Sequence, residues 1–178
     1  MNRIAKFEKV SFEQFKKDWI DTFPSRYNEY DDNILDGLIG NIYNSIKLPQ
    51  RATAGSAGYD FFCPYGFMVS ENSSIKIPTG IRCKIEEGWV LQAYPRSGHG
   101  FKYGIHLANT VGIIDQDYYG AKNEGHIFIK LVNDSKLAKP VEIKTGDAFC
   151  QGIFLPYGIT EDDDVTDTRH GGFGSTGN

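Results

Sequence analysis

Two acidic residues in a glycine-bounded segment are the first side chains in this sequence that could act in catalysis. Residues 112–120 read GIIDQDYYG and place Asp115 and Asp117 two positions apart, so in a strand both carboxylates lie on one face. A positioned carboxylate can orient and deprotonate a water molecule. The spacing does not choose between the two acids, and a solvated turn is the default interpretation.

The glycine-rich end of the sequence is a second candidate, for binding an anion. Residues 172–177 satisfy the GxGxxG pattern of dinucleotide sites, but the printed sequence stops one residue later, without the helix which that use needs. Asn178 also stands where a phosphate-binding P-loop has its lysine. We expect instead a mobile tail whose backbone N–H groups fold over an anion together with Arg169.

The histidines and cysteines lack the close spacing of a metal cage. We expect the histidines to be solvated or to lie in the core, and the cysteines to be reduced core residues. The residues are His99, His106, His126 and His170, with Cys63, Cys83 and Cys150.

Five short segments follow one another along the chain with compatible spacing. They are residues 57–60 (AGYD), 95–98 (PRSG), 112–120, 146–151 (GDAFCQ) and the tail from residue 169. Together they resemble the five ordered motifs of the dUTPase family, the trimeric dUTP nucleotidohydrolases. The likeness extends from about Arg51 to Gly177. It implies a jelly-roll fold, a homotrimer, and Mg²⁺-dependent hydrolysis of dUTP to dUMP and pyrophosphate. This reaction removes dUTP from the nucleotide pool and supplies dUMP.

The resemblance assigns the third motif to the base, the sugar and the attacking water. Asp115 matches the catalytic carboxylate that activates water for in-line attack on the α-phosphorus. Tyr118 matches the tyrosine that packs under the deoxyribose. Uracil offers one donor between two acceptors, which backbone groups of a predicted β-hairpin at 108–118 can match, whereas cytosine would leave polar groups unpaired at about 1–3 kcal/mol each. The uracil contacts implied are Asn109, Ile113 and Ile114.

The resemblance assigns the other motifs to the triphosphate and its metal. Arg96 and Arg169 are the cations, and Mg²⁺ is held mainly by the phosphates, with Asp60 reaching it through water. The implied neutral phosphate contacts are Ser97, Gly98 and Gln151, and Phe173 with Gly174 would close over the uracil as the tail orders.

Two departures from the family pattern and two alternatives qualify this reading. The tail motif is one residue shorter than usual, and residues 121–124 (AKNE) are extra, so no contact is transferred to the residues directly after Gly120. A dCTP deaminase of the same fold would need a glutamate where Lys130 stands, which argues against deamination. A nucleotide-binding regulatory module is the second alternative.

The elements that must position these residues are mostly strands. Alternating patterns predict strands at 58–63, 74–77, 81–85, 88–95, 127–131, 141–144 and 147–155. Before them, helical spacing predicts one helix after a Ser11 cap and a second capped by Asp31 or Asp32. Its apolar pairs advance in steps of four, and Ile34, Leu38 and Ile42 are expected to cover a surface; the pairs are Ile34/Leu35, Leu38/Ile39 and Ile42/Tyr43, followed by Ile46.

We therefore expect an all-β jelly roll or distorted barrel with an N-terminal helical appendage. The predicted division is a helical extension at 1–48, a β domain at 49–168 and a flexible lid at 169–178. We expect the helices to cover the β domain or a neighbouring subunit, and their removal to leave the chemistry qualitatively intact.

Composition excludes several partners. The net charge is −4, which gives no general attraction to nucleic acid or anionic lipid. No apolar run approaches the roughly 20 residues of a membrane span, and the charged start lacks the apolar core of a signal peptide. A cytoplasmic location is the expectation, with dUTP and two further copies of the chain as partners and neither membrane nor nucleic acid.

Overall fold

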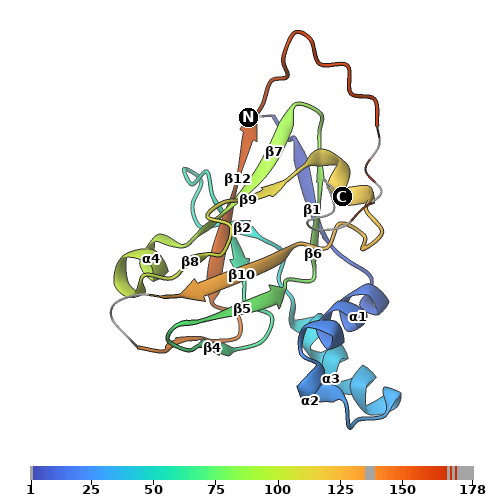
Figure 1. Ribbon diagram of the computed structural model, residues 1–178, viewed down its shortest axis with the longest axis vertical. Helices are drawn as coiled ribbons and strands as arrows, with labels where there is room; N and C mark the ends of the chain where they lie inside the picture. Colours follow the sequence, from blue (N-terminus) through green and yellow to red (C-terminus); the bar gives the residue numbers. More distant parts are fainter. Residues whose placement is uncertain (1, 135–138, 168, 170, 172–178) are drawn as a thin grey trace.

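The computed structural model describes residues 2–134, 139–167, 169 and 171, and β-strands dominate it (Figure 1). The strands are β1 Ala5–Lys9, β2 Gln50–Arg51, β3 Tyr59–Phe62, β4 Phe67–Val69, β5 Ser73–Pro78, β6 Ile81–Ile85, β7 Trp89–Pro95, β8 His106–Leu107, β9 Gly112–Ile114, β10 Phe128–Asn133, β11 Val141–Ile143 and β12 Ala148–Pro156. The helices are α1 Phe12–Thr22, α2 Pro24–Tyr27, α3 Asp32–Ser45, α4 Ser97–Tyr103 and the 3₁₀ helix η1 Gln116–Gly120.

The largest sheet carries most of the predicted site segments. Its strands lie in the order β2-β3-β12-β7-β9, and all pairs are antiparallel. Gln151 on β12 lies opposite both Asp60 on β3 and Tyr94 on β7, so the first, second and fourth motifs meet on adjacent strands. The other sheets are β5-β10-β8, β1-β6 and β11-β4.

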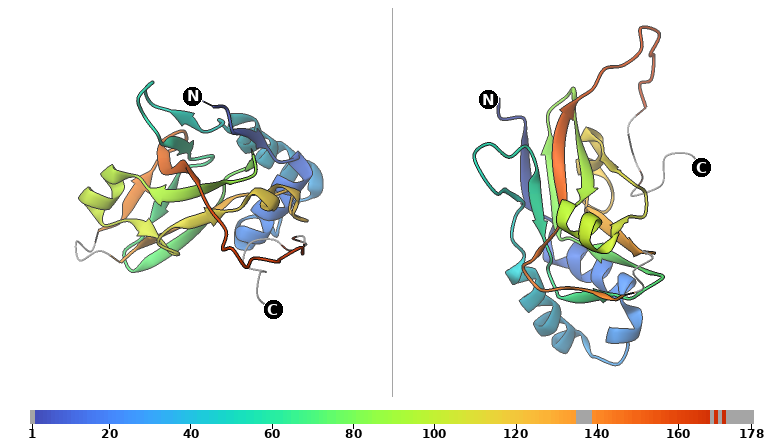
Figure 2. Two further views of the ribbon diagram at one scale, coloured as in Figure 1. Left: turned by 90° about the horizontal axis from the view of Figure 1, so that it is seen from above. Right: turned by 90° about the vertical axis from the view of Figure 1, so that its left-hand side faces the viewer.

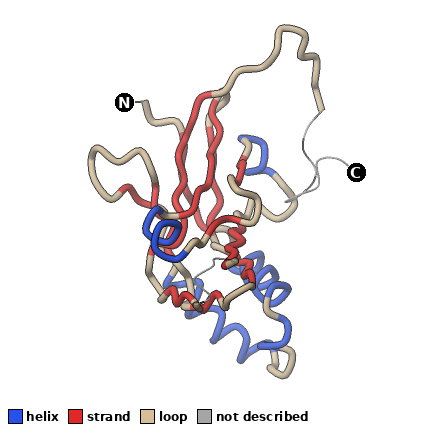
Figure 3. The backbone as a smooth tube through the Cα atoms, turned by 60° about the vertical axis from the view of Figure 1, so that its left-hand side comes forward, coloured by secondary structure: helices blue, strands red, loops and turns tan. Residues whose placement is uncertain are grey.

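The predicted fold class is confirmed: an all-β jelly roll with a group of helices at one end. Figures 2 and 3 show α1, α2 and α3 together at that end, whereas α4 lies apart from them. All seven predicted strands are present, with small differences at their ends.

The two predicted N-terminal helices are also confirmed, including their caps. The Ser11 hydroxyl accepts a hydrogen bond from the backbone N–H of Gln14 at 3.1 Å, and Asp31 rather than Asp32 caps α3. The predicted buried face of α3 is partly wrong, because Ile34 and Leu38 are exposed. The face that packs inward consists of Leu35, Ile39 and Ile42.

The helices and the strands share one hydrophobic core. Phe15 and Trp19 of α1 and Ile39 of α3 are buried in the same cluster as Phe61, Ile77 and Leu91 of the sheets. Gly80 has φ +73°, and a Cβ there would lie 2.3 Å from Cδ1 of Ile46. Glycine therefore allows the end of α3 to approach the β5–β6 turn.

Several elements were not predicted from the sequence, and two of them, β1 and α4, bear on the argument. β1 pairs with β6, so the segment before the helices is a strand of the β structure. α4 forms over SGHGFKY in spite of its two glycines and ends at Gly104, which adopts φ +67°. The division at residues 48 and 168 stays a prediction.

The cysteine prediction is confirmed. Cys63, Cys83 and Cys150 are free and buried, and burial raises the pKa of each thiol to about 12. In the described part of the chain, no helix has the length and apolar character needed to cross a membrane.

Candidate functional site

The third motif changes direction at its central acid. β9 ends at Ile114, Asp115 follows in extended conformation, and η1 begins at the next residue. This turn leaves the Asp115 side chain 52% exposed, while Ile114 is buried in the core. The carboxylate is therefore fixed at its base and open to a ligand or water.

Arg169 lies directly on this motif. Its Nη1 donates to Oδ2 of Asp115 at 3.0 Å and to Oδ1 of Asp117 at 3.1 Å, and its guanidinium lies 5.2 Å from the centre of the Tyr118 ring. The segment after β12 makes this possible by extending past the end of the sheet and turning back (Figure 1). Sequence separation alone, 54 residues, gave no indication of this contact.

The charge of Arg169 is well supported. Partial burial acts against the charged form, but the hydrogen bonds to Asp115 and Asp117 outweigh it and raise the pKa of Arg169. Its Nε is buried and has no hydrogen-bond partner among the described residues. This N–H is therefore a buried donor whose hydrogen bond is not made in this arrangement.

Tyr118 is buried, and its hydroxyl group is fixed by two hydrogen bonds. Its side chain hydroxyl donates to the carbonyl oxygen of His126 at 2.6 Å and accepts from Nδ2 of Asn123 at 2.8 Å. Burial raises the pKa of Tyr118, so the phenol stays protonated. The ring is held at its hydroxyl end, and Arg169 lies over its face.

The strands on either side of residues 108–111 do not pair with each other, although the backbone N–H groups of Ala108, Thr110 and Val111 donate to the carbonyl oxygens of Lys130, Leu107 and Asn109. We predicted a hairpin at 108–118, but β8 pairs with β10 and β9 pairs with β7, so the two strands belong to different sheets. Between them Thr110 adopts φ +63°, in the left-handed region. β9 is the last strand of its sheet, so the N–H and C=O groups on its outer edge face no further strand among the described residues and can pair with a base.

The residues predicted to bind uracil lie between β8 and the end of β9. Asn109 and Ile113 are exposed, and Ile114 is buried. A Cβ on Gly112 would lie 3.7 Å from Nδ2 of Asn109, which places the Asn109 amide beside β9.

The phosphate residues form a second group. Nε of Arg96 lies 3.3 Å from Oδ1 of Asp60, and Nε2 of Gln151 donates to the carbonyl oxygen of Pro95 at 3.2 Å. A Cβ on Gly58 would lie 2.9 Å from Oε1 of Gln151, so the first motif closely approaches the fourth. Ser97 and Gly98 are exposed at the start of α4, directly after Arg96.

Within one chain these two groups lie far apart. Ile114 pairs with Leu91, whereas Arg96 follows the opposite end of β7. Leu91 and Arg96 are separated by five residues, or about 17 Å of extended strand. The structure therefore joins Asp115 to Tyr118 and Arg169, and Asp60 to Arg96, but does not join the two groups.

The side chains around Asp60 are compatible with a Mg²⁺ ion that is bound mainly by the phosphates of a nucleotide. Among the described residues, no group of three or more His, Cys, Asp or Glu side chains could enclose a cation. Asp60 is a single carboxylate beside Arg96, which fits one water-mediated contact to Mg²⁺ bound by phosphates.

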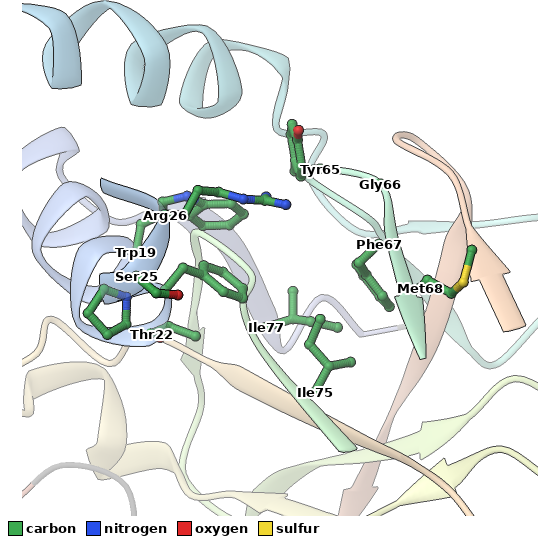
Figure 4. Close-up of a pocket in the computed structure, with 12 residues that line it drawn as sticks. Trp19, Thr22, Ser25, Arg26, Tyr65, Gly66, Phe67, Met68, Ile75 and Ile77 are labelled. Carbon is green, nitrogen blue, oxygen red and sulfur yellow. The ribbon is translucent and has the colours of Figure 1, made fainter. Parts of the chain in front are cut away.

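A separate cavity does not belong to this constellation. It measures about 350 Å³ and lies between the helices and β4–β5 (Figure 4). Trp19, Phe23, Tyr65 and Ile77 form much of its wall, with Arg26 at 5.1 Å from the Tyr65 ring. None of the predicted site residues that the structure describes lines it.

Some residues at the site were missed or cannot be placed. Asn123 and His126, which hold Tyr118, lie past the point where motif transfer stopped, and only their nearness to the motif in sequence could have suggested them. The predicted lid residues Phe173 and Gly174 lie outside the described residues.

Comparison with known proteins gives consistent results. The dUTPase family model matches residues 44–177. The deoxyuridine 5'-triphosphate nucleotidohydrolase of Lactococcus lactis is 38% identical over 135 residues, covering 74% of this chain and 89% of that protein. The Actinobacillus pleuropneumoniae protein of the same name is 38% identical over 157 residues, covering 84% and 97%.

Solved structures agree with the fold. A dUTPase crystal structure from Streptococcus mutans has a TM-score of 0.62 at 29% identity and covers 87% of this chain and 98% of its own. A mutant dUTPase from phage phi11 of S. aureus, described with a structural Mg(II) ion, has a TM-score of 0.57 at 20% identity, covering 71% and 94%. Because the family model spans most of the sequence and the curated relatives match over most of their length, the chain belongs to the dUTPase family of nucleotidohydrolases.

Proposed function

We propose that this protein hydrolyses dUTP to dUMP and pyrophosphate in the cytoplasm, with Asp115 as the base that activates water. The observation that carries the proposal is the position of Asp115, half exposed at the junction of β9 and η1 and adjoined by Tyr118 and Arg169. The water oxygen bonds to the α-phosphorus, the bond to the pyrophosphate oxygen breaks in line, and Asp115 takes the proton.

Uracil and deoxyribose would be recognised by the third motif. Uracil would bind the open edge between β8 and β9, beside Asn109 and the backbone of Ile113 and Ile114. The Tyr118 ring, fixed through its hydroxyl, would contact the sugar, where a 2′-hydroxyl would clash. In this arrangement Arg169 leaves the ring face for the phosphates when substrate binds.

The triphosphate would be bound by the second group together with Arg169, which lies beside Asp115 in the first group. Arg96 and Arg169 provide the positive charge, and Ser97, the Gly98 amide and Gln151 provide neutral contacts. When bound, Mg²⁺ would offset phosphate charge, with Asp60 holding one of its water ligands. Phe173 and Gly174 remain predicted lid residues.

A complete site would need more than one chain, and we propose a homotrimer. The support is the strand register, because β7 separates Arg96 from Asp115 by about 17 Å. A second copy that brought its Arg96 to the first copy's Asp115 would remove this separation. In the family resemblance, the tail comes from the third chain.

Pyrophosphate release tests the proposal. The purified protein is incubated with Mg²⁺ and, separately, dUTP, UTP, dCTP and dTTP. We expect rapid release from dUTP and far slower release from the others. Equal turnover of UTP would contradict the role of Tyr118. Ammonia from dCTP would favour the deaminase alternative, which Lys130 argues against, and binding without turnover would favour a regulatory module.

A further inference from the structure

The N-terminal segment contacts the end of the third motif and the residues directly after it. The Tyr119 hydroxyl donates to Oε2 of Glu8 at 2.7 Å. The Ser11 backbone N–H and hydroxyl donate to the two carboxylate oxygens of Glu124 at 2.7 and 2.6 Å. Further along, Nδ1 of His126 donates to Oδ2 of Asp18 at 2.5 Å. Residues 8–18 thus hold residues 119–126 at three points.

His126 is the centre of these contacts. It is fully buried, and its Nε2 accepts a hydrogen bond from the backbone N–H of Gly80 at 2.7 Å, so its proton lies on Nδ1, facing Asp18. The carbonyl oxygen of the same residue accepts from the Tyr118 hydroxyl. One residue therefore connects α1 directly to the tyrosine of the site.

The Glu124 contact replaces part of an ordinary helix cap. In a capping box, the side chain three residues after the cap bonds back to the cap's own N–H. Here that side chain, Gln14, donates to Asp18 at 2.8 Å instead, and Glu124 takes the Ser11 N–H. Glu124 has φ +57°, an uncommon conformation for a non-glycine residue, and it belongs to the extra residues 121–124.

The N-terminal helical segment, which lies outside the matched motifs, is thus bonded to the extra residues 121–124 through Ser11 and Glu124. The N-terminal helix supplies Ser11 and Asp18, and the extra segment supplies Asn123 and Glu124. Asn123 in turn donates to Tyr118. These contacts form a continuous set that ends at the predicted sugar-binding ring.

We infer that residues 8–18 are a positioning clamp for η1, with Asp18 as the main positioning residue for Tyr118 and, through η1, for Asp115. A small displacement of reacting groups lowers catalysis by large factors, so a loosened η1 reduces turnover even though Asp18 touches no substrate. The N-terminal segment is then required for efficient chemistry, contrary to the expectation from the sequence. The catalytic part of this inference rests on the proposed function; the clamp itself rests on the contacts alone.

The test compares Asp18→Ala with Asp21→Ala, a matched change at an exposed position on the same helix. Hydrogen exchange is measured by mass spectrometry on peptides covering residues 112–127 and β12, alongside kcat and KM for dUTP and UTP. For Asp18→Ala we expect faster exchange in 112–127 only. We also expect kcat/KM for dUTP to fall about 10-fold to 100-fold, with a smaller fall for UTP. The ratio of kcat/KM for dUTP to kcat/KM for UTP should therefore decrease. Asp18→Asn keeps an acceptor for Nδ1–H of His126, so it should restore most of the slow exchange in 112–127 and most of the kcat/KM for dUTP. Asp21→Ala should match wild type in both measurements.

Unchanged exchange in 112–127 in folded Asp18→Ala protein would overturn the clamp. Faster exchange with an unchanged dUTP to UTP ratio would overturn the positioning role. If Asp18→Ala does not fold, Glu124→Ala is tested instead, because Glu124 is the more exposed partner of the clamp and accepts both hydrogen bonds from Ser11. The same exchange and kinetic measurements apply. Wild-type protein without dUTP turnover would refute the proposed function, while the exchange experiment would still decide the clamp.

Discussion

Mixing two inactive variants tests whether the active site is shared between chains. Asp115→Asn removes the proposed base and keeps the side-chain shape, and Arg96→Ala removes a phosphate-binding cation from the opposite end of β7. Each change should lower turnover on the order of 10²-fold or more when all chains carry it. Both variants keep the rest of the chain, including Arg169, so each can provide what the other lacks.

The strand register sets the expected size of the recovery. Because about 17 Å of β7 separates the two positions in one chain, a working site takes Asp115 from one copy and Arg96 from another. In an equal, random mixture, half of the chains carry an intact Asp115 and the other half an intact Arg96. About a quarter of the sites then receive both, so activity should reach about a quarter of wild type.

The assay measures pyrophosphate release from dUTP after the two variants are unfolded together and refolded. Native mass spectrometry of differently tagged chains establishes that mixed oligomers have formed. Separately refolded variants, combined afterwards without exchange, provide the background.

Recovery near one quarter supports the shared site. If mixed oligomers form and activity stays at the background of the separate variants, Asp115 and Arg96 act within one chain, and the reasoning from the β7 register is refuted.

Three further predictions concern stability and the metal. Trp19→Ala, which empties a buried site and removes the hydrogen bond to Tyr27, should lower the free energy of unfolding by about 3–5 kcal/mol in denaturant titrations; a loss below 1 kcal/mol would mean that α1 adds little to the core. Burial acts to raise the pKa of Asp18, but hydrogen bonds from His126 and Gln14 lower it below its ordinary 3.8, so the stability it contributes is present above that value and is lost as pH falls through the lower folded pKa. Acid unfolding of Asp18→Asn should therefore depend less on pH in that range than wild type, and parallel curves would contradict the assignment. Removal of Mg²⁺ with EDTA should abolish turnover without changing the melting temperature, because the described residues contain no protein metal cage; a lowered melting temperature would contradict this.

Local sequence patterns predicted the type of an element correctly where its apolar residues recur with the period of a helix or a strand. β6 and β10 alternate strictly, and α1 and α3 have recognisable caps, so their type could be read directly. β1 is different because its five residues become a strand through pairing with β6, about 75 residues later. α4 contains two glycines, which lower helix propensity, so only its packing in the fold selects a helix.

The same distinction applies to the candidate site. The ordered motifs, taken together, predicted Asp115, Tyr118 and Arg96 as site residues through the family resemblance, and these roles stay predictions. The contact of Arg169 with Asp115 and the separation of Arg96 from Asp115 depend on the path of the chain and the order of the strands. The pairing of Asp18 with His126 joins residues 108 positions apart, and neither residue type indicates the other in the sequence.

The three buried cysteines provide a way to measure which part of the molecule opens first. A thiol with a pKa of about 12 has almost no thiolate at neutral pH, so an alkylating reagent reacts only after the chain around it has opened. Cys83 on β6 lies opposite Phe7 of β1, whereas Cys150 lies on β12, between β3 and β7. Alkylation at Cys83 therefore times the detachment of the N-terminal strand, and alkylation at Cys150 times the opening of the largest sheet. A single labelling experiment on unmodified protein separates local from global unfolding.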